Sequence, residues 1–268
     1  MATEHINGID WFYEVRGKGH PVVFLHGWGA DSRVWRQQAS FFSEHYQVIL
    51  VDLPGHGQTP WQEISIDGIA CSLLELLRKV CASPVSLVGS SLGGVLALKV
   101  FAQGPEFIRS LTLTGSQPRF LKCDDYPYGL SERQIIRLAG HLERHYEKAI
   151  DQFFVSLFTR EERQSLLFRW LRRFKRSEGF PQKEAMLSIF VQLKDLDARP
   201  VLKNVHVPFQ LINGDADLVC QAGVEKVFQK DIRHARIELY EGCGHFPFLI
   251  QAHRFNVSLK KFLESFAA

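Results

Sequence analysis

The chain has 268 residues, of which 46% are hydrophobic and 23% are charged, and its formal net charge at pH 7 is +3. This composition is ordinary for a globular protein and excludes a disordered or fibrous chain. The length suits one large α/β domain or two small ones, and the net charge is too small to indicate a nucleic-acid-binding surface.

The predicted elements alternate along the first part of the chain. The dipeptide Asn7-Gly8 favours a tight hairpin between two antiparallel strands at the start. Short apolar, β-branched runs predict buried strands at residues 22–25, 48–51, 85–88 and 108–114. Apolar residues at helical spacing predict helices at residues 32–45, 66–80 and 92–102. This alternation predicts a mostly parallel sheet with helices on both faces.

In the second part of the chain the alternation of strands and helices stops and later resumes. Residues 117–200 lack strand-like runs and are helical, aromatic and rich in arginine. Strands are predicted again at 209–212 and 237–240, followed by an amphipathic helix at 247–266. We therefore expect an α/β core formed by residues 1–116 and 201–268, with residues 117–200 inserted as a helical lid.

The stretch G-S-S-L-G places Ser91 in a G-x-S-x-G pattern between a predicted strand and a predicted helix. A serine in that position sits on a sharp turn, and Gly89 and Gly93 leave room for the turn to close. The hydroxyl would then be exposed to a substrate. Taken alone the pattern is loose, and the plainer interpretation is an ordinary serine in a glycine-rich loop.

A serine hydroxyl needs a base, and the base needs a group that holds its tautomer. His245 follows the last predicted strand in a glycine-rich loop, and Asp217 follows the strand before it. The carboxyl ends of parallel strands open at one edge of the sheet, so these loops should converge near Ser91. Asp215 is an alternative acid, because side-chain alternation would direct both carboxylates the same way. Singly, a loop histidine is more often solvated, and Gly-Asp pairs usually form turns.

Acyl transfer also needs backbone N–H donors for the oxyanion of its tetrahedral intermediate. Leu92, directly after Ser91, can supply one donor. Trp28 can supply the other, because the His26-Gly27-Trp28-Gly29 loop leaves a strand predicted to lie beside the strand of Ser91. A plain turn is the alternative interpretation of this loop.

Together these motifs resemble the α/β-hydrolase superfamily over nearly the whole chain. They are the stretch L-H-G-W-G at 25–29, V-D-L-P-G-H-G at 51–57, the Ser91 pattern, Asp217 and the Gly-His pair at 244–245. The resemblance implies an α/β-hydrolase fold with an inserted helical lid and a cofactor-independent serine hydrolase whose triad residues follow in the order Ser, Asp, His. The motifs at 25–29, 34–35 and 51–57 are further similar to the pimeloyl-acyl carrier protein methyl ester esterase family of biotin synthesis.

That narrower resemblance implies a carboxylesterase that cleaves a small methyl ester from a pimeloyl chain attached to an acidic carrier protein. The family's spacing favours Asp217 over Asp215 as the acid. Two positions depart from the family pattern. Ser90 stands where a tryptophan usually precedes the nucleophile, and the proline expected soon after the acid is replaced near Cys220. The first departure leaves the shape of the acyl pocket, and hence the substrate, open.

Arginines gather on one side of two helices predicted in the lid segment. In the first, the apolar residues Ile135, Ile136, Leu138, Ala139 and Leu142 lie opposite the arginines, and in the second Leu167, Trp170, Leu171 and Phe174 do so. Arginine suits carboxylate and phosphate partners, so these faces could dock an acidic carrier protein. They could equally be solvated faces. The arginines concerned are Arg133, Arg137 and Arg144, then Arg169, Arg172, Arg173 and Arg176.

Other features limit the remaining possibilities. The five cysteines show no C-x-x-C pair or metal-ligand spacing, and no leader-like or membrane-spanning run is seen, so we expect a cytoplasmic enzyme without metal or cofactor. A small acyl ester is the expected substrate, and neither nucleic acid nor a membrane is expected as a partner. A monomer is favoured, although the sequence does not determine the oligomeric state. Alternative functions are a general short-chain esterase, a C–C bond hydrolase, a perhydrolase, or a ligand-binding protein without catalysis.

Overall fold

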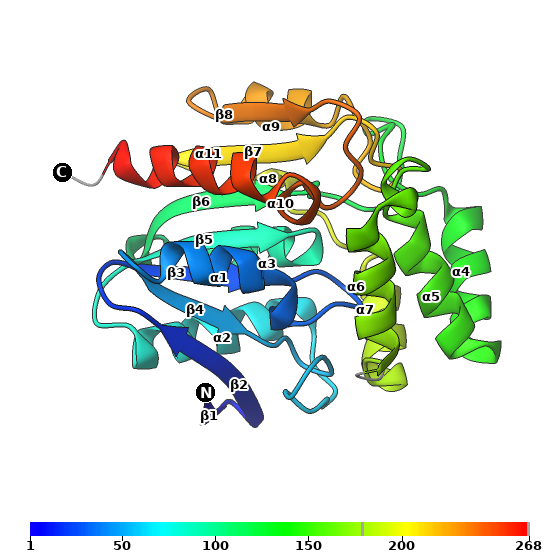
Figure 1. Cartoon of the computed structure of the whole chain (residues 1–268), viewed down its shortest axis with the longest axis horizontal. Coiled ribbons are helices and arrows are strands. Elements are labelled where there is room, and N and C mark those ends of the chain that lie inside the picture. The colour runs from blue at the N-terminus through cyan, green and yellow to red at the C-terminus, as the bar shows by residue number, and fades with distance from the viewer. Residues whose placement is uncertain (178–179, 267–268) are drawn as a thin grey trace.

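The strands of the described residues form one eight-stranded sheet in the order β1-β2-β4-β3-β5-β6-β7-β8 (Figure 1). The computed structural model describes the backbone of residues 1–177 and 180–266 and the side chains of residues 1–173 and 180–266. β1 and β2 pair antiparallel with each other, β2 pairs antiparallel with β4, and the remaining pairs are parallel. The strands are β1 (Ala2–Ile6), β2 (Ile9–Arg16), β3 (Pro21–Leu25), β4 (Gln47–Val51), β5 (Val85–Ser90), β6 (Ile108–Thr114), β7 (Phe209–Gly214) and β8 (Arg236–Tyr240).

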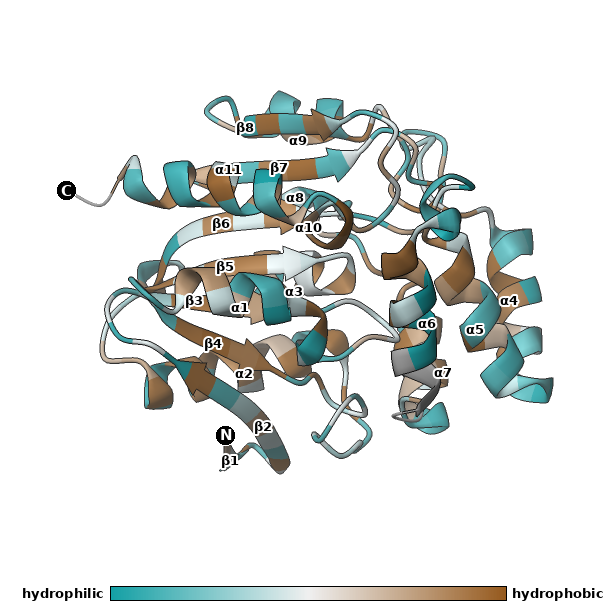
Figure 2. Ribbon diagram, in the orientation of Figure 1, coloured by the Kyte–Doolittle hydropathy of each residue, from teal (hydrophilic) through white to brown (hydrophobic). Residues whose placement is uncertain are grey.

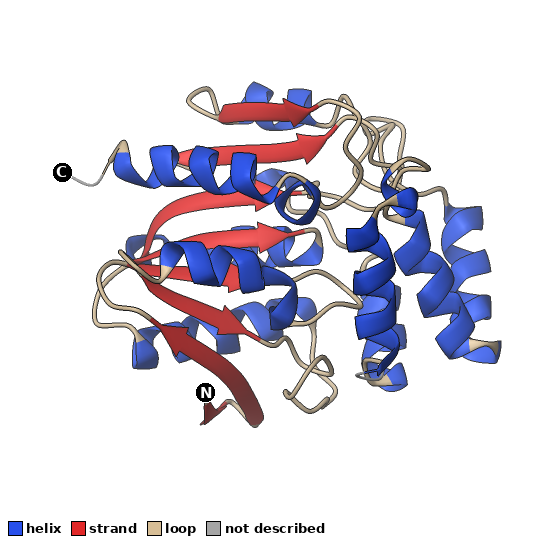
Figure 3. Ribbon diagram, viewed as in Figure 1, coloured by secondary structure: helices blue, strands red, loops and turns tan. Residues whose placement is uncertain are grey.

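Helices cover both faces of the sheet (Figure 3). One face packs under α2 and α3 in a cluster that contains Leu73 and Val95, and the other packs under α1 and α11 in a cluster that contains Trp35 and Phe255. The neighbouring strands β3 and β5 are buried along their whole length, so neither alternates between a polar and an apolar face; β3 is apolar throughout, and β5 is apolar apart from Ser86, Gly89 and Ser90 (Figure 2). The helices around the sheet are η1 (Ser32–Trp35), α1 (Arg36–Phe42), α2 (Ile66–Val80), α3 (Leu92–Gln103), η2 (Pro105–Phe107), α8 (Arg199–Leu202), α9 (Glu225–Asp231), α10 (Pro247–Ile250) and α11 (Ala252–Glu264).

A second group of helices stands beyond the carboxyl ends of the parallel strands, at the right of Figure 1. These are α4 (Glu132–Arg144), α5 (Tyr146–Ser156), η3 (Glu162–Gln164), α6 (Leu166–Ser177) and α7 (Lys183–Gln192). They belong to the segment expected to form the lid. The exact division into core and lid at residues 117 and 200 stays a prediction, and α8 crosses the second of these boundaries. Within the described ranges, every helix is too short or too polar to cross a lipid bilayer.

The predicted mostly parallel sheet with helices on both faces and the opening hairpin are confirmed. Asn7 and Gly8 both have positive φ angles, 51° and 82°, as a turn of this type requires. The hairpin therefore starts the sheet as the sequence predicts.

Several predicted helix boundaries are wrong. The helix predicted at 32–45 is the short η1 followed by α1, and the one predicted at 247–266 divides at Gln251, which has non-helical angles of −116° and 47°. The second arginine-bearing helix predicted in the lid segment is α6, which follows η3 and begins only after Ser165. The extended backbone of Ser165 (ψ 153°) and its side-chain bond to the Phe168 N–H mark the helix start. α9 was not predicted.

Candidate active site

Ser91 lies on the sharp turn between β5 and α3. Its φ and ψ angles of 53° and −117° are a conformation that residues other than glycine rarely adopt, and such strain clusters at functional sites. A Cβ atom at Gly89 would lie 2.3 Å from the Gly93 carbonyl oxygen, so the turn closes only because residue 89 has no side chain. Ser91 is partly exposed between the buried Ser90 and Leu92. The turn therefore presents the hydroxyl as the sequence predicts.

His245 and Asp217 contact each other in the interior. The Nδ1 atom of His245 lies 2.7 Å from Oδ2 of Asp217, and their side chains are 2% and 0% exposed. The other carboxylate oxygen of Asp217 accepts hydrogen bonds from the backbone N–H groups of Val219 and Cys220, at 2.7 and 3.0 Å. Because both oxygens are occupied by donors, the carboxylate is held rigidly and holds the imidazole ring in turn.

Asp215 has a different role in the structure. Its Oδ1 atom accepts a hydrogen bond from the Gly242 N–H at 2.7 Å, which joins the loops after β7 and β8. Asp215 is exposed, whereas Asp217 is buried, with 4% of the whole residue exposed. Only Asp217 of these two acids contacts the imidazole.

The end of β6 connects the Ser91 turn to the His245 loop. The Ser91 N–H donates to the carbonyl of Thr114 at 3.1 Å. The next residue, Gly115, has a φ of 50°, and a Cβ atom there would lie 2.2 Å from the His245 carbonyl oxygen and 3.4 Å from Nδ1. Ser91 and His245 therefore pack against consecutive residues of one strand end, and only glycine fits between them.

The loop after β3 passes directly beside Ser91. A Cβ atom at Gly27 would lie 2.9 Å from the Ser91 Cβ and 3.6 Å from its Oγ. Among the described residues, the N–H groups of Trp28 and Leu92 donate to no other group of the chain. Both predicted oxyanion donors are therefore available to bind a ligand near the serine.

Two buried histidines, which the sequence analysis left without a role, fix this loop. Nε2 of His56 accepts the Gly29 N–H at 3.1 Å, and Nε2 of His26 accepts the Leu53 N–H at 3.0 Å. Burial lowers the pKa of His26, which keeps the ring neutral so that it can accept this bond. The signal was in the sequence, since both residues lie in His-Gly pairs that follow predicted strands.

The Trp28 side chain links the same loop to the helices of the lid segment. Its Nε1 donates to the carbonyl of Met186 in α7 at 3.1 Å, and its ring packs edge-on against Phe153 of α5, with 4.9 Å between ring centroids. The indole is 7% exposed. The loop that carries the Trp28 N–H therefore bonds to the core through His26 and His56 and contacts α5 and α7 through the Trp28 side chain.

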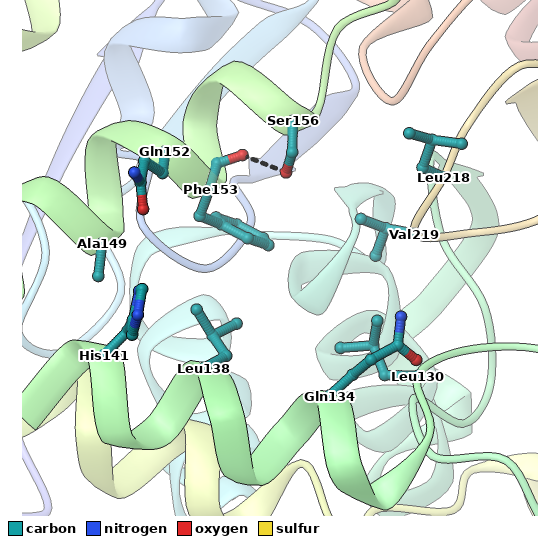
Figure 4. Close-up of a pocket in the computed structure, with 10 residues that line it drawn as sticks. All are labelled: Leu130, Gln134, Leu138, His141, Ala149, Gln152, Phe153, Ser156, Leu218 and Val219. Atoms are coloured by element: carbon teal, nitrogen blue, oxygen red, sulfur yellow. Dashed lines mark hydrogen bonds between the residues drawn. The ribbon is translucent and has the colours of Figure 1, made fainter.

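A cavity of about 280 Å³ lies between α4, α5 and the loop after β7 (Figure 4). Its wall includes Phe153, which touches Trp28, and Val219, whose N–H holds Asp217. The lining is mainly apolar, and its polar side chains are those of Gln134, His141, Gln152 and Ser156. The full lining is Leu130, Gln134, Leu138, His141, Ala149, Gln152, Phe153, Ser156, Leu218 and Val219. Ser91, Asp217 and His245 are not among these lining residues; the cavity neighbours the site through Phe153 and Val219.

Asp217, Cys220 and His245 have ligand atoms within 4.8 Å of one another, which is close enough for a metal ion. The chemistry of this set does not suit one. The Nδ1 atom of His245 already bonds to Asp217, and burial raises the pKa of the Cys220 thiol well above its ordinary value, so it stays protonated against the Gly115 carbonyl at 3.1 Å. This arrangement favours a hydrogen-bonded acid and base.

The arginines of the predicted docking faces differ in their surroundings. Arg172 is engaged within the lid segment, since its Nη2 lies 2.7 Å from Oδ2 of Asp151. The side chain of Arg176 lies outside the described residues. Of the apolar residues predicted on the sides opposite the arginines, Ile136 and Trp170 are exposed, at 65% and 49%. The arginines Arg133, Arg137, Arg144, Arg169 and Arg173 are exposed.

Comparison with known proteins places this geometry in context. A family model described as the alpha/beta hydrolase fold matches residues 20–252. The chain is 31% identical over 250 residues to a protein of Nitrosomonas europaea named pimeloyl-[acyl-carrier protein] methyl ester esterase, covering 93% of this chain and 95% of that one. It is 29% identical to a protein of Chromobacterium violaceum with the same name, covering 96% and 99%.

Solved structures are similar over almost the whole chain. An esterase from Exiguobacterium antarcticum matches with a TM-score of 0.90 and 26% identity, covering 98% of each chain. A bromoperoxidase from Bacillus anthracis matches with a TM-score of 0.91 and 27% identity, covering 98% of this chain and 99% of that one.

Proposed function

Because the chain belongs to the α/β-hydrolase fold family, we propose that it is a serine esterase that hydrolyses the methyl ester of a pimeloyl chain bound to an acyl carrier protein. The observation that carries the reaction type is the buried 2.7 Å contact between His245 and Asp217 beside the strained Ser91 turn. The names of the relatives from Nitrosomonas europaea and Chromobacterium violaceum support the substrate.

In this mechanism Ser91 is the nucleophile, His245 the base and Asp217 the residue that orients it. Nδ1–H of His245 donates to Asp217, which leaves Nε2 unprotonated and able to accept the serine proton. The serine Oγ then bonds to the ester carbonyl carbon. As the tetrahedral intermediate collapses, the C–O bond to the methoxy group breaks and His245 returns the proton to the departing methanol.

A water molecule completes the cycle. It gives a proton to His245 while its oxygen bonds to the acyl carbon; the bond from that carbon to Ser91 Oγ then breaks, and His245 returns the proton to Ser91 as the carboxylic acid leaves. In both halves of the reaction the carbonyl oxygen becomes an anion. We assign its two donors to the backbone N–H groups of Trp28 and Leu92, and the latter also lies at the positive end of α3.

The cavity behind Phe153 suits the acyl chain. Its apolar wall can bury methylene groups, each worth about 0.8 kcal/mol when removed from water. The cavity lies between α4 and α5, so an acyl chain in it would lie within the lid segment (Figure 4). We therefore assign residues 117–200 the role of a lid over the acyl site.

The exposed arginines of α4 and α6 suit an acidic carrier protein. Arg133 and Arg137 of α4 and Arg169 and Arg173 of α6 are exposed, whereas Arg172 is engaged with Asp151. Complementary charge of this kind mainly accelerates association and fixes orientation. A carrier protein that serves biotin synthesis is a cytoplasmic partner, so the proposal includes a cytoplasmic enzyme; that the enzyme is a monomer stays a separate prediction.

The second candidate is a general short-chain esterase with the same triad. The likeness to the esterase from Exiguobacterium antarcticum, at 26% identity, supports it. So does Ser90, which stands where the carrier-specific family usually has a tryptophan. This candidate needs no carrier protein.

Hydrolysis of matched esters tests the proposal. The substrates are methyl pimeloyl-carrier protein, free monomethyl pimelate and p-nitrophenyl butyrate, with methanol release measured for the first two. We expect kcat/KM to be highest for the carrier-bound ester. Turnover of the p-nitrophenyl ester without any turnover of the carrier-bound ester would contradict the substrate and favour the general esterase.

A charge-reversal variant tests the docking surface separately. The double variant Arg133→Glu, Arg137→Glu should lower kcat/KM for the carrier-bound ester roughly 10- to 100-fold through slower association. The same variant should leave p-nitrophenyl butyrate hydrolysis unchanged. Equal loss on both substrates would show that the arginines support the fold rather than a partner.

A further inference from the structure

Glu162 is a buried carboxylate in the link between α5 and α6, far along the chain from the candidate catalytic residues. It is 8% exposed. Its Oε1 accepts the N–H of Gly244 at 2.9 Å, and its Oε2 accepts the N–H of Thr159 at 2.8 Å. Its partners are these two backbone N–H groups and the neighbouring thiol of Cys243, whose pKa burial and Glu162 both raise. Burying a carboxylate lowers the free energy of unfolding unless hydrogen bonds offset the loss of water, so a buried Glu162 indicates a role beyond packing.

The link between α5 and α6 also bonds to His245, the residue after Gly244 in the loop that follows β8. The backbone N–H of His245 donates to the carbonyl of Leu157 at 2.9 Å. Beside it the ring of Phe158 packs against Phe246, with 5.4 Å between centroids. The amides of Gly244 and His245 are therefore both bonded to the α5–α6 link.

The fit between the link and the loop is close. A Cβ atom at Gly244 would lie 2.7 Å from Oε2 of Glu162 and 2.8 Å from the carbonyl of Leu157. Leu157 and Phe158 belong to the hydrophobic cluster that also contains Phe246 and Phe255 of the core. This part of the lid segment is thus packed into the core.

We propose that Glu162 is a positioning residue that fixes the backbone of Gly244 and thereby sets the imidazole of His245 relative to Ser91. The inference rests on the proposed serine-esterase function and adds a residue to it. Asp217 holds the ring at Nδ1, while Glu162 and the Leu157 carbonyl hold the backbone from which the ring projects. Hydrogen bonds to an ionised acceptor are about twice as strong as neutral ones, which suits a group that must hold a loop still.

Glu162→Gln is the sharpest test, because it keeps the side-chain volume. An amide has only one acceptor oxygen, and its NH₂ group cannot accept a backbone N–H, so one of the two bonds is lost. Glu161→Gln is the matched control, since Glu161 is the exposed neighbour and its change removes the same charge. Glu162→Ala removes both bonds.

The kinetics are measured on p-nitrophenyl butyrate, which needs no carrier docking. A small misplacement of a catalytic group costs up to about 100-fold, so we expect kcat of Glu162→Gln to fall roughly 10- to 100-fold with KM within about 3-fold. The rate at which a fluorophosphonate modifies Ser91 should fall in parallel. Glu161→Gln should match the wild type in all three quantities.

A spectroscopic measurement separates positioning from loss of fold. The His245 Nδ1 proton, bonded to Asp217, should give a resolved proton NMR signal in the wild type and Glu161→Gln, and a shifted or broadened one in Glu162→Gln at a temperature where all three proteins are fully folded. The inference is overturned if Glu162→Gln equals Glu161→Gln in kcat and labelling, or if only KM changes. If Glu162→Ala does not fold, Glu162→Gln alone decides. A wild-type protein that resists the fluorophosphonate would instead contradict the proposed function itself.

Discussion

The Nδ1 atom of His245 lies 2.7 Å from Oδ2 of Asp217, and both side chains are almost fully buried. Water cannot compete for this contact, so the carboxylate determines which nitrogen of the ring carries the proton. Asp215, only two residues away, bonds instead to the backbone of Gly242. Two acids that the sequence leaves equivalent thus have different partners.

This difference gives a paired prediction for the two acids. Asp217→Asn should lower kcat by roughly 10⁴-fold, because an amide in this place favours the wrong imidazole tautomer. Asp215→Asn should change kcat by no more than about 3-fold and cost about 1 kcal/mol of unfolding free energy through its weakened bond to Gly242. Steady-state kinetics and urea unfolding measure both. The reverse ranking of kcat losses would assign the acid role to Asp215.

The buried His26 predicts a dependence of stability on pH. Burial lowers its pKa in the folded state below the ordinary value of 6.5. The unfolded chain therefore binds a proton first as the pH falls. The contribution of His26 to stability is complete above about pH 6.5 and is lost as the pH falls from there towards the folded-state pKa, at up to about 1.4 kcal/mol per pH unit.

Urea unfolding at pH 7.5 and pH 5.5 checks this prediction. The wild type should lose unfolding free energy between the two, and His26→Asn, which cannot titrate, should lose less. His20, whose pKa burial also lowers, contributes equally to both proteins. An identical pH dependence in the variant would contradict the account.

Ser90 predicts a stabilising substitution. Its side-chain oxygen is buried and, within the described ranges, has no hydrogen-bond partner in the protein. Ser90→Ala removes this unsatisfied group and should raise the unfolding free energy by about 1 kcal/mol. Ser110→Ala is the control, because the Ser110 hydroxyl donates to Ser86 at 2.8 Å, and its loss should destabilise by a similar amount. Destabilisation by Ser90→Ala would mean that its hydroxyl has a partner in solution.

Much of the fold could be predicted because buried parallel strands are short runs rich in apolar and β-branched residues. The strand predicted at 108–114 coincides with β6, and the helix at 66–80 coincides with α2, whose apolar face spans many turns. α9 was not predicted because it is only seven residues long. Phe228 is its one buried residue, and a single buried residue cannot show a helical spacing of apolar positions. Short helices depend on tertiary packing that a local pattern does not contain.

Part of the candidate site could likewise be predicted from the sequence, and part appears only in the structure. The motifs located the loops of Ser91, Asp217 and His245, because glycines and strand ends mark them in the sequence. Side-chain alternation left Asp215 and Asp217 equivalent and the family resemblance favoured Asp217; in the folded geometry it is Asp217 that bonds to His245. Glu162 left no signal at all, since its partner is the backbone N–H of Gly244, 82 residues away, and a backbone contact imposes no side-chain pattern. The roles of the triad residues stay predictions until they are tested.

The most direct measurement is the mass of the protein after reaction with a fluorophosphonate, followed by mapping of the modified peptide. The account predicts one adduct, on Ser91, formed by the wild type, absent from Ser91→Ala and much slower to form in Asp217→Asn. A folded wild-type protein that gains no adduct, or gains it at another residue, would contradict the claim that Ser91 is an activated nucleophile.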